Sequence, residues 1–133
     1  NGCHKRLRLP RREFQTVSNF SLSWKTADDI VVMTPKGYVD GLGAEKLDDA
    51  SQEVLDKGMK KLVVNFSDIQ FINSVGASIL TSVVHRARES ASQLCFTNMN
   101  KIHREVFELL GITKYVKVFS EEGDAIHYLN GRN

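Results

Sequence analysis

The feature that most constrains the fold is a repeated change in hydrophobic period along the chain. Short, nearly continuous apolar runs alternate with segments whose apolar residues recur every three or four positions. The first pattern is typical of strands covered on both faces, and the second is typical of amphipathic helices. Residues 20–24 instead alternate between apolar and polar, as in a half-buried strand. The other predicted strands lie near residues 30–39, 61–66, 94–97 and 115–119, and the predicted helices near residues 43–57, 74–87, 102–110 and 121–129.

This alternation gives the element order strand-strand-helix-strand-helix-strand-helix-strand-helix. Strands that are joined by helices pair in parallel through right-handed crossovers. A short polar turn at residues 26–29 separates the first two strands, so we expect a hairpin whose first strand is an antiparallel edge. The sequence therefore predicts a single α/β domain, with a mixed, mostly parallel sheet of about five strands and about four helices.

Composition and charge divide the chain into a tail and a domain. The 133 residues are 41% hydrophobic and 26% charged, a balance typical of one soluble domain. Five of the 18 basic and one of the 16 acidic residues lie in positions 1–13, which therefore carry a net charge of +4 against −2 for the rest. We expect residues 1–14 to be a flexible basic segment or linker and residues 15–133 to form the domain. A slightly acidic domain is not expected to bind nucleic acid directly.

Two further absences narrow the class of protein. No stretch of the sequence approaches the roughly 18 apolar residues that would span a bilayer. Cys3 lies in the tail and Cys95 in an apolar run, so we expect neither a disulfide between them nor a metal site. These features favour a reducing, cytoplasmic location.

The sequence contains no recognisable catalytic pattern. Ser74 is not part of a G-x-S-x-G turn, because position 72 is Ile. Gly41 and Gly43 form only G-x-G, without the third glycine of a phosphate-binding loop. No histidine has a triad-like neighbour; the four are His4, His85, His103 and His127. We therefore expect no enzymatic activity and no cofactor.

The most informative segment is the predicted loop 67–73 together with the helix that follows it. Functional sites of open α/β sheets lie outside the carboxyl ends of the parallel strands, which is where this loop falls. We expect Ser74 to be the helix N-cap, with its hydroxyl accepting a hydrogen bond from the amide of residue 76 or 77. Two interpretations remain open. Ser74 is only a cap, or it also carries a phosphate at the positive end of the helix.

Several segments match the motifs of one family, in the right order and at the right spacing. They are Gly37-Tyr38-Val39-Asp40, residues 62–67, Phe71-Ile72-Asn73-Ser74-Val75-Gly76, residues 106–112, and Val118-Phe119 with Ala125. From about Phe20 to Leu129 the chain resembles STAS domains, and most closely the bacterial anti-sigma-factor antagonists. Asn73 stands where that family usually has an acidic residue, and Val75 stands where it has a second hydroxyl.

The resemblance implies a non-catalytic binding module in a partner-switching cascade. The unphosphorylated module binds a kinase-type anti-sigma factor, phosphorylation of one serine by that factor ends the binding, and a phosphatase restores it. Ser74 corresponds to the phosphorylated serine, and Asp40 is expected near it. Gly41, Asn73, Val75 and Gly76 are expected at the docking face. The resemblance also leaves weak nucleotide binding open.

Three other functions remain as alternatives. Related STAS domains are subunits of large stress-sensing assemblies, which here would bring other STAS subunits as partners. Other STAS domains form the cytosolic tails of anion transporters, in which case the basic segment 5–12 would be a juxtamembrane linker. A nucleotide hydrolase is the least favoured alternative, because the sequence lacks a phosphate-binding loop and a set of metal-binding carboxylates.

Overall fold

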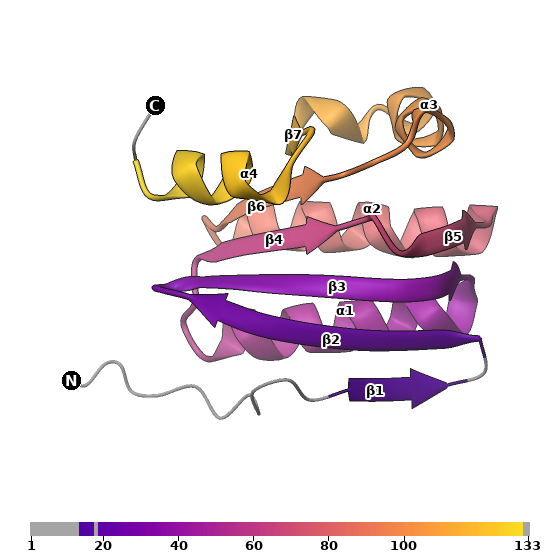
Figure 1. Cartoon of the computed structure of the whole chain (residues 1–133), viewed down its shortest axis with the longest axis horizontal. Helices are drawn as coiled ribbons and strands as arrows, with labels where there is room; N and C mark the ends of the chain where they lie inside the picture. Colours follow the sequence, from indigo (N-terminus) through magenta and orange to yellow (C-terminus); the bar gives the residue numbers. More distant parts are fainter. Residues whose placement is uncertain (1–13, 18, 132–133) are drawn as a thin grey trace.

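The computed structural model describes residues 14–17 and 19–131, which form one mixed sheet with helices on both of its faces (Figure 1). The strands are β1 (Phe14–Val17), β2 (Phe20–Ala27), β3 (Ile30–Val39), β4 (Lys61–Asn65), β5 (Ile69–Ile72), β6 (Gln93–Thr97) and β7 (Lys117–Phe119). The helices are α1 (Gly41–Asp56), α2 (Ser74–Glu89), α3 (Lys101–Leu110) and α4 (Glu122–Leu129), with a short 3-10 turn at Ile112–Lys114.

The sheet has the order β1-β2-β3-β4-β6-β7, and β5 pairs with β3 beyond the end of β4. The first three strands are antiparallel neighbours, whereas the pairs β3·β4, β3·β5, β4·β6 and β6·β7 are parallel. The prediction of a single α/β domain with a mixed, mostly parallel sheet and four helices is therefore confirmed.

Two strands were not predicted. Strand β1 pairs with the outer side of β2, so the prediction that β2 forms the edge is wrong. Phe14, the last residue of the predicted flexible segment 1–14, begins β1, and residues 1–13 lie outside the described part of the chain. Strand β5 lies within the predicted loop 67–73. With four residues and two exposed side chains, β5 gives no clear hydrophobic period in the sequence.

The ten-residue strand β3 explains how β5 fits into the sheet. Residues 30–33 of β3 pair with β4, and residues 37–39 pair with β5. Pro35 lies between these two ladders, where its missing N–H removes no bond to either of them. As a result, β4 and β5 both pair with the same side of β3. The chain leaves β5 at Ile72 and begins α2 at Ser74.

Each face of the sheet is covered by different helices (Figure 1). Helices α1 and α2 pack on one face over the larger core, which includes Leu47, Leu80 and Phe66. Helix α4 covers the other face over a smaller core around Val32, Val63 and Cys95. An ion pair between Asp48 of α1 and Arg86 of α2 also joins the two neighbouring helices. Because β3, β4, β5 and β6 point the same way, α1, α2 and α3 all begin at the carboxyl edge of the sheet.

Candidate functional site

Helix α1 begins immediately after β3 with an aspartate cap. The side chain of Asp40 accepts a hydrogen bond from the N–H of Gly43 at 2.9 Å, and its backbone is extended, as expected of an N-cap. The carbonyl of Asp40 accepts the first helical bond, from the N–H of Ala44 at 2.8 Å. The carboxylate also lies at the positive end of the helix dipole, which stabilises its charge.

Helix α2 begins immediately after β5 in the same way, but with an asparagine cap. The Oδ1 atom of Asn73 accepts a hydrogen bond from the N–H of Gly76 at 2.8 Å, and the backbone of Asn73 is again extended. The prediction that Ser74 is the N-cap is therefore wrong. Ser74 is the first residue of the helix, and its side chain is exposed. Asn73 takes the capping position because its amide oxygen reaches the third amide of the helix, as an aspartate would.

The ladder between β3 and β5 holds the two helix starts side by side. Val39 pairs with Ile72, and the N–H of Asn73 donates to the carbonyl of Val39 at 3.2 Å. One residue beyond each strand, Asp40 and Asn73 therefore occupy adjacent strand ends. A Cβ atom placed on Gly41 would lie 3.3 Å from Cγ1 of Val75, so the first turns of the two helices are also close. The predicted proximity of Asp40 to the Ser74 segment agrees with this geometry.

The third residue of each helix must be a glycine, because the backbone of β3 is too near. A Cβ atom on Gly76 would lie 2.0 Å from the carbonyl oxygen of Val39. On Gly43 it would lie 2.5 Å from the carbonyl oxygen of Tyr38. Atoms of these types do not approach so closely, so any larger residue would move a helix away from the sheet. These two glycines thus fix the positions of both caps.

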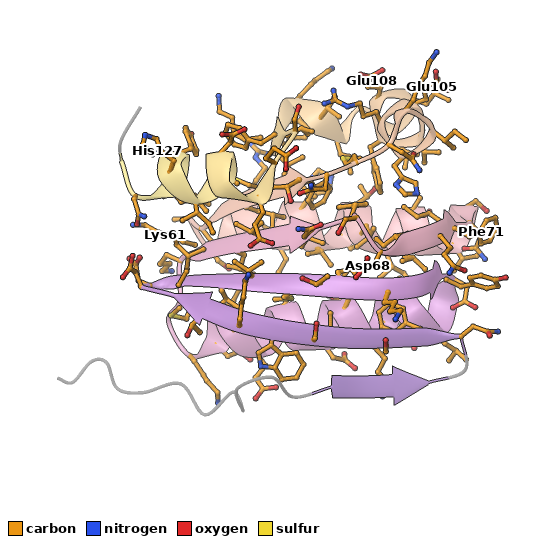
Figure 2. The ribbon with its side chains drawn as sticks, in the orientation of Figure 1. Lys61, Asp68, Phe71, Glu105, Glu108 and His127 are labelled. Atoms are coloured by element: carbon orange, nitrogen blue, oxygen red, sulfur yellow. The ribbon has the colours of Figure 1, made fainter. Side chains whose placement is uncertain are left out.

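Exposed apolar side chains surround the two helix starts, and we call this set the apolar patch. Its members are Tyr38 (42% exposed), Leu42 (60%), Phe71 (49%) and Val75 (55%). The rings of Tyr38 and Phe71 contact each other edge to face, with centroids 5.8 Å apart. Phe71 lies at the outer end of β5, at the carboxyl edge of the sheet (Figure 2). Large apolar side chains gathered on an exposed edge are typical of a binding surface for another protein.

The sequence placed residues 41–43, and with them Leu42, at the docking face, but it did not single out Tyr38 and Phe71 as site residues. The pairing of β3 with β5 shifts register between Gly37 and Tyr38, where Gly37 has a φ of 102°. This bulge pairs Tyr38 with Phe71. A large aromatic residue next to the strand end is the only signal of this arrangement in the sequence, and it does not reveal the bulge.

In the described part of the chain, no group of three or more His, Cys, Asp and Glu side chains is arranged to hold a metal ion. Within the same residues, no helix is long and apolar enough to cross a membrane. What the site offers is an exposed hydroxyl at a helix N-terminus, a carboxylate on the neighbouring helix start and the exposed side chains of the apolar patch. This combination can bind a protein surface and can accept a phosphate.

The fold is that of a known class of domain. The family model of the STAS domain matches residues 21–125, and the chain belongs to that family. Among its relatives, the anti-sigma-F factor antagonist RsfB of Mycobacterium tuberculosis is 26% identical over 102 residues, which cover 77% of this chain and 83% of RsfB.

Solved structures show the same fold. A crystal structure of an anti-sigma factor antagonist from Mycobacterium paratuberculosis superposes with a TM-score of 0.74 at 21% identity, covering 84% of this chain and 94% of that one. The Bacillus cell fate determinant SpoIIAA in its phosphorylated form gives a TM-score of 0.63 at 18% identity, covering 88% of this chain and 97% of SpoIIAA. The resemblance inferred from the motifs is thus confirmed, and these relatives are named as regulatory antagonists.

Proposed function

We propose that this protein is an anti-sigma-factor antagonist that binds its partner through the apolar patch and is switched off by phosphorylation of Ser74. The observation that carries the proposal is the exposed Ser74 side chain at the first position of α2, next to Val75 of the patch. The family membership and the names of the relatives support the same role.

The asparagine cap makes Ser74 suited to modification. Because Asn73 already accepts the hydrogen bond of Gly76, the fold does not need the Ser74 hydroxyl as a cap. A phosphoryl group transferred from ATP to Ser74 Oγ, with release of ADP, therefore leaves the cap in place. The first-turn N–H groups and the helix dipole stabilise the added negative charge.

The same phosphate opposes binding of a partner. It adds a charge of about −1.5 to −2 among apolar side chains that a partner would bury. It also lies near the Asp40 carboxylate, on the adjacent helix start, so the like charges repel each other. Docking would have to remove water from both charges, which costs more than the apolar contacts return. Hydrolysis by a phosphatase restores the neutral surface.

This switch involves two partner proteins and takes place in one compartment. The partner is a kinase-type anti-sigma factor, a phosphatase resets the switch, and the cycle takes place in the cytoplasm. Regulation requires no catalysis and no cofactor held by this chain. The kinase supplies the chemistry, and this protein supplies a hydroxyl and a docking surface.

Phosphorylation is tested with kinase-type anti-sigma factors from the protein's own organism. Each purified factor and ATP are incubated with the full chain and with the variants Ser74→Ala and Ser78→Ala, and the products are analysed by mass spectrometry. Ser78 is the matched control, an exposed serine one turn further along α2. We expect one added phosphate on the wild type and on Ser78→Ala, and none on Ser74→Ala. An unmodified wild type, or a modified Ser74→Ala chain, would contradict the switch.

Binding is measured separately, so that docking and phosphorylation are distinguished. We expect Ser74→Ala to bind the anti-sigma factor as the wild type does, because the hydroxyl is not a cap. Phe71→Ala removes an exposed ring from the patch and is expected to weaken binding at least tenfold, about 1.4 kcal/mol. Ser74→Glu is expected to weaken binding in the same direction. If Phe71→Ala and Ser74→Glu both bind normally, the docking face is elsewhere.

A further inference from the structure

A second candidate site lies at the opposite edge of the sheet from Ser74. A cavity of about 270 Å³ is lined by residues 92–95, residues 113–117 and Tyr128 of α4. It is located where β6 begins and where the chain enters β7. The cavity is present because β7 starts late: its ladder with β6 begins at the pair Cys95 and Lys117, which leaves the outer edge of Gln93 and Leu94 uncovered.

Two hydrogen-bond donors belong to residues that line this cavity, the Ser92 hydroxyl and the Leu94 N–H. The Oγ atom of Ser92 is buried and has no hydrogen-bond partner among the described residues. The N–H of Gln93 donates to the carbonyl of Lys60 at 2.7 Å, on the β4 side. Along an extended strand the next N–H, that of Leu94, points to the opposite side, toward the uncovered edge. A buried hydroxyl without a partner costs free energy, and an acceptor atom bound in the cavity would remove that cost.

The charges around the cavity are of one sign. Lys114 and Lys117 line it, and the lining contains no Asp or Glu. The guanidinium of Arg88, at the end of α2, lies 4.3 Å from the ring centroid of Tyr115, another lining residue. None of these three cations is paired with a carboxylate within residues 14–17 and 19–131. The site therefore has an uncompensated positive charge, which favours an anion.

The thiol at the cavity does not neutralise this charge. Burial raises the pKa of Cys95 to about 12, and the nearby Lys117 ammonium only partly opposes that effect. Cys95 is therefore an uncharged, apolar part of the wall near neutral pH. Leu94, Val116 and the ring of Tyr128 add further apolar surface. Lys117 Nζ lies 5.6 Å from the centroid of the Tyr128 ring, so a cation and an aromatic face are adjacent.

We propose that this cavity binds a small organic anion, with a carboxylate or phosphate group held by Lys114, Lys117 and Ser92 and an apolar body against the aromatic wall. The volume lies at the small end of ligand sites, which limits the ligand to a compact molecule. The cavity and Ser74 are at opposite edges of the sheet, so this proposal does not depend on the phosphorylation switch.

The test uses two anionic probes and one neutral probe. The ¹⁵N-labelled full chain is titrated with phenyl phosphate, with benzoate and with benzyl alcohol while amide chemical shifts are recorded by NMR. We expect saturable shifts at Leu94 and Val116 with at least one of the anions. Comparison of the two anions shows whether the site prefers phosphate or carboxylate, and benzyl alcohol is expected to bind at least tenfold more weakly.

Variants assign the binding to the cavity. The double variant Lys114→Gln and Lys117→Gln is expected to weaken anion binding at least tenfold, and Ser92→Ala is expected to weaken it several-fold. Lys101→Gln is the matched control, because Lys101 is an exposed lysine at the start of α3, away from the cavity. The amide spectrum of each variant also reports whether it is folded. The proposal is overturned by the absence of saturable shifts up to about 10 mM probe, by equal binding of benzyl alcohol, or by unchanged affinity in the double variant.

Discussion

Helices α1 and α2 begin side by side with the same pattern of an Asx cap, two residues and a glycine. In α1 the pattern is Asp40, Gly41, Leu42 and Gly43, and in α2 it is residues 73–76. Both caps accept from the amide three residues further on, at 2.9 Å and 2.8 Å. Both second helical residues are exposed and apolar. The two starts differ in the charge of the cap and in the first helical residue, which is glycine in α1 and Ser74 in α2.

This comparison separates the requirements of the fold from those of the proposed function. The capping oxygen and the glycine occur in both helices, because each helix has to start against the backbone of β3. The hydroxyl occurs in one helix only, so the fold does not require it. The capping carboxylate likewise occurs only in α1, as Asp40. In α2 the side-chain amide of Asn73 accepts the equivalent hydrogen bond.

Helix α3 shows why the glycines are specific to α1 and α2. Asn100 caps α3 by accepting from the N–H of His103 at 2.8 Å, in the same geometry. The third residue of α3 is a buried histidine rather than a glycine. Its ring packs against Phe66, with centroids 5.9 Å apart. A side chain fits at this position in α3, whereas a strand carbonyl takes up the space at Gly43 and Gly76.

The largest effect is expected from Gly76→Ala. The new methyl group would collide with the carbonyl oxygen of Val39, so α2 has to move away from β3. We expect a loss of about 3 kcal/mol in the free energy of unfolding, and about 2 kcal/mol for Gly43→Ala. Urea unfolding followed by the fluorescence of Trp24, the single and buried tryptophan, measures both losses.

Gly123→Ala is the control for the loss of glycine itself. Gly123 lies in α4, and no atom lies within 4 Å of the position its Cβ would take. An alanine in a helix is favoured over glycine by about 0.5–1 kcal/mol, so this variant is expected to be slightly more stable. If Gly76→Ala and Gly123→Ala have similar effects, the close approach of α2 to β3 does not constrain residue 76.

The sequence predicted the helices well, because helical periodicity is a local pattern. The rule that sites lie at carboxyl strand ends indicated the segment that contains Ser74, whereas the proximity of Asp40 was implied by the family resemblance. The identity of the cap was not predictable in the same way. Asn73 and Ser74 are both favourable N-cap residues. Which of them caps α2 depends on the residue at which β5 ends, and β5 ends at Ile72, immediately before Asn73. Strand β5 exists because β3 is longer than β4, which is a tertiary relation that local periodicity does not contain.

The start of α3 differs from the other two helix starts because its third residue, His103, is a buried titratable side chain. Burial lowers the pKa of His103 below its usual value of 6.5, and its Nδ1 atom is buried without a hydrogen-bond partner in the described structure. The unfolded chain therefore binds this proton more readily than the folded protein does. Stability is expected to fall as the pH drops below about 6.5 and to level off below the folded pKa, with a slope of at most about 1.36 kcal/mol per pH unit.

His103→Phe should remove this part of the pH dependence, because an aromatic ring of similar shape fits among Phe66 and its neighbours without titrating. His127→Gln, at an exposed histidine of α4, is the matched histidine control (Figure 2). Burial alone would raise the pKa of Glu122, but bonds from Asn65 and Lys25 lower it below 4.5. Its stabilising effect is therefore present above about pH 4.5 and is lost in more acidic solution than the pH range of about 5 to 7 compared for His103. A His103→Phe profile identical to the wild type between pH 5 and about 7 would contradict this assignment.

The smallest effect tests the charge that distinguishes the two caps. Asn73→Asp gives α2 the carboxylate of α1, and Asp40→Asn gives α1 the amide of α2. In both helices the capping oxygen keeps its hydrogen bond. The exchange therefore changes the interaction of the charge with the helix dipole and with the neighbouring helix start. We expect Asn73→Asp to gain, and Asp40→Asn to lose, about 0.3–1 kcal/mol at neutral pH and low ionic strength. Urea unfolding should show both effects shrinking in about 1 M salt, where exposed charges are screened. If the chain with both Asn73→Asp and Asp40→Asn is as stable as the wild type, aspartate and asparagine cap the two helices equally well. Asn73→Asp leaves Asp40 in place, so that variant holds both carboxylates. If Asn73→Asp stabilises the wild type less than it stabilises the Asp40→Asn variant, the two helix starts repel each other, and a phosphate on Ser74 would meet the same repulsion from Asp40.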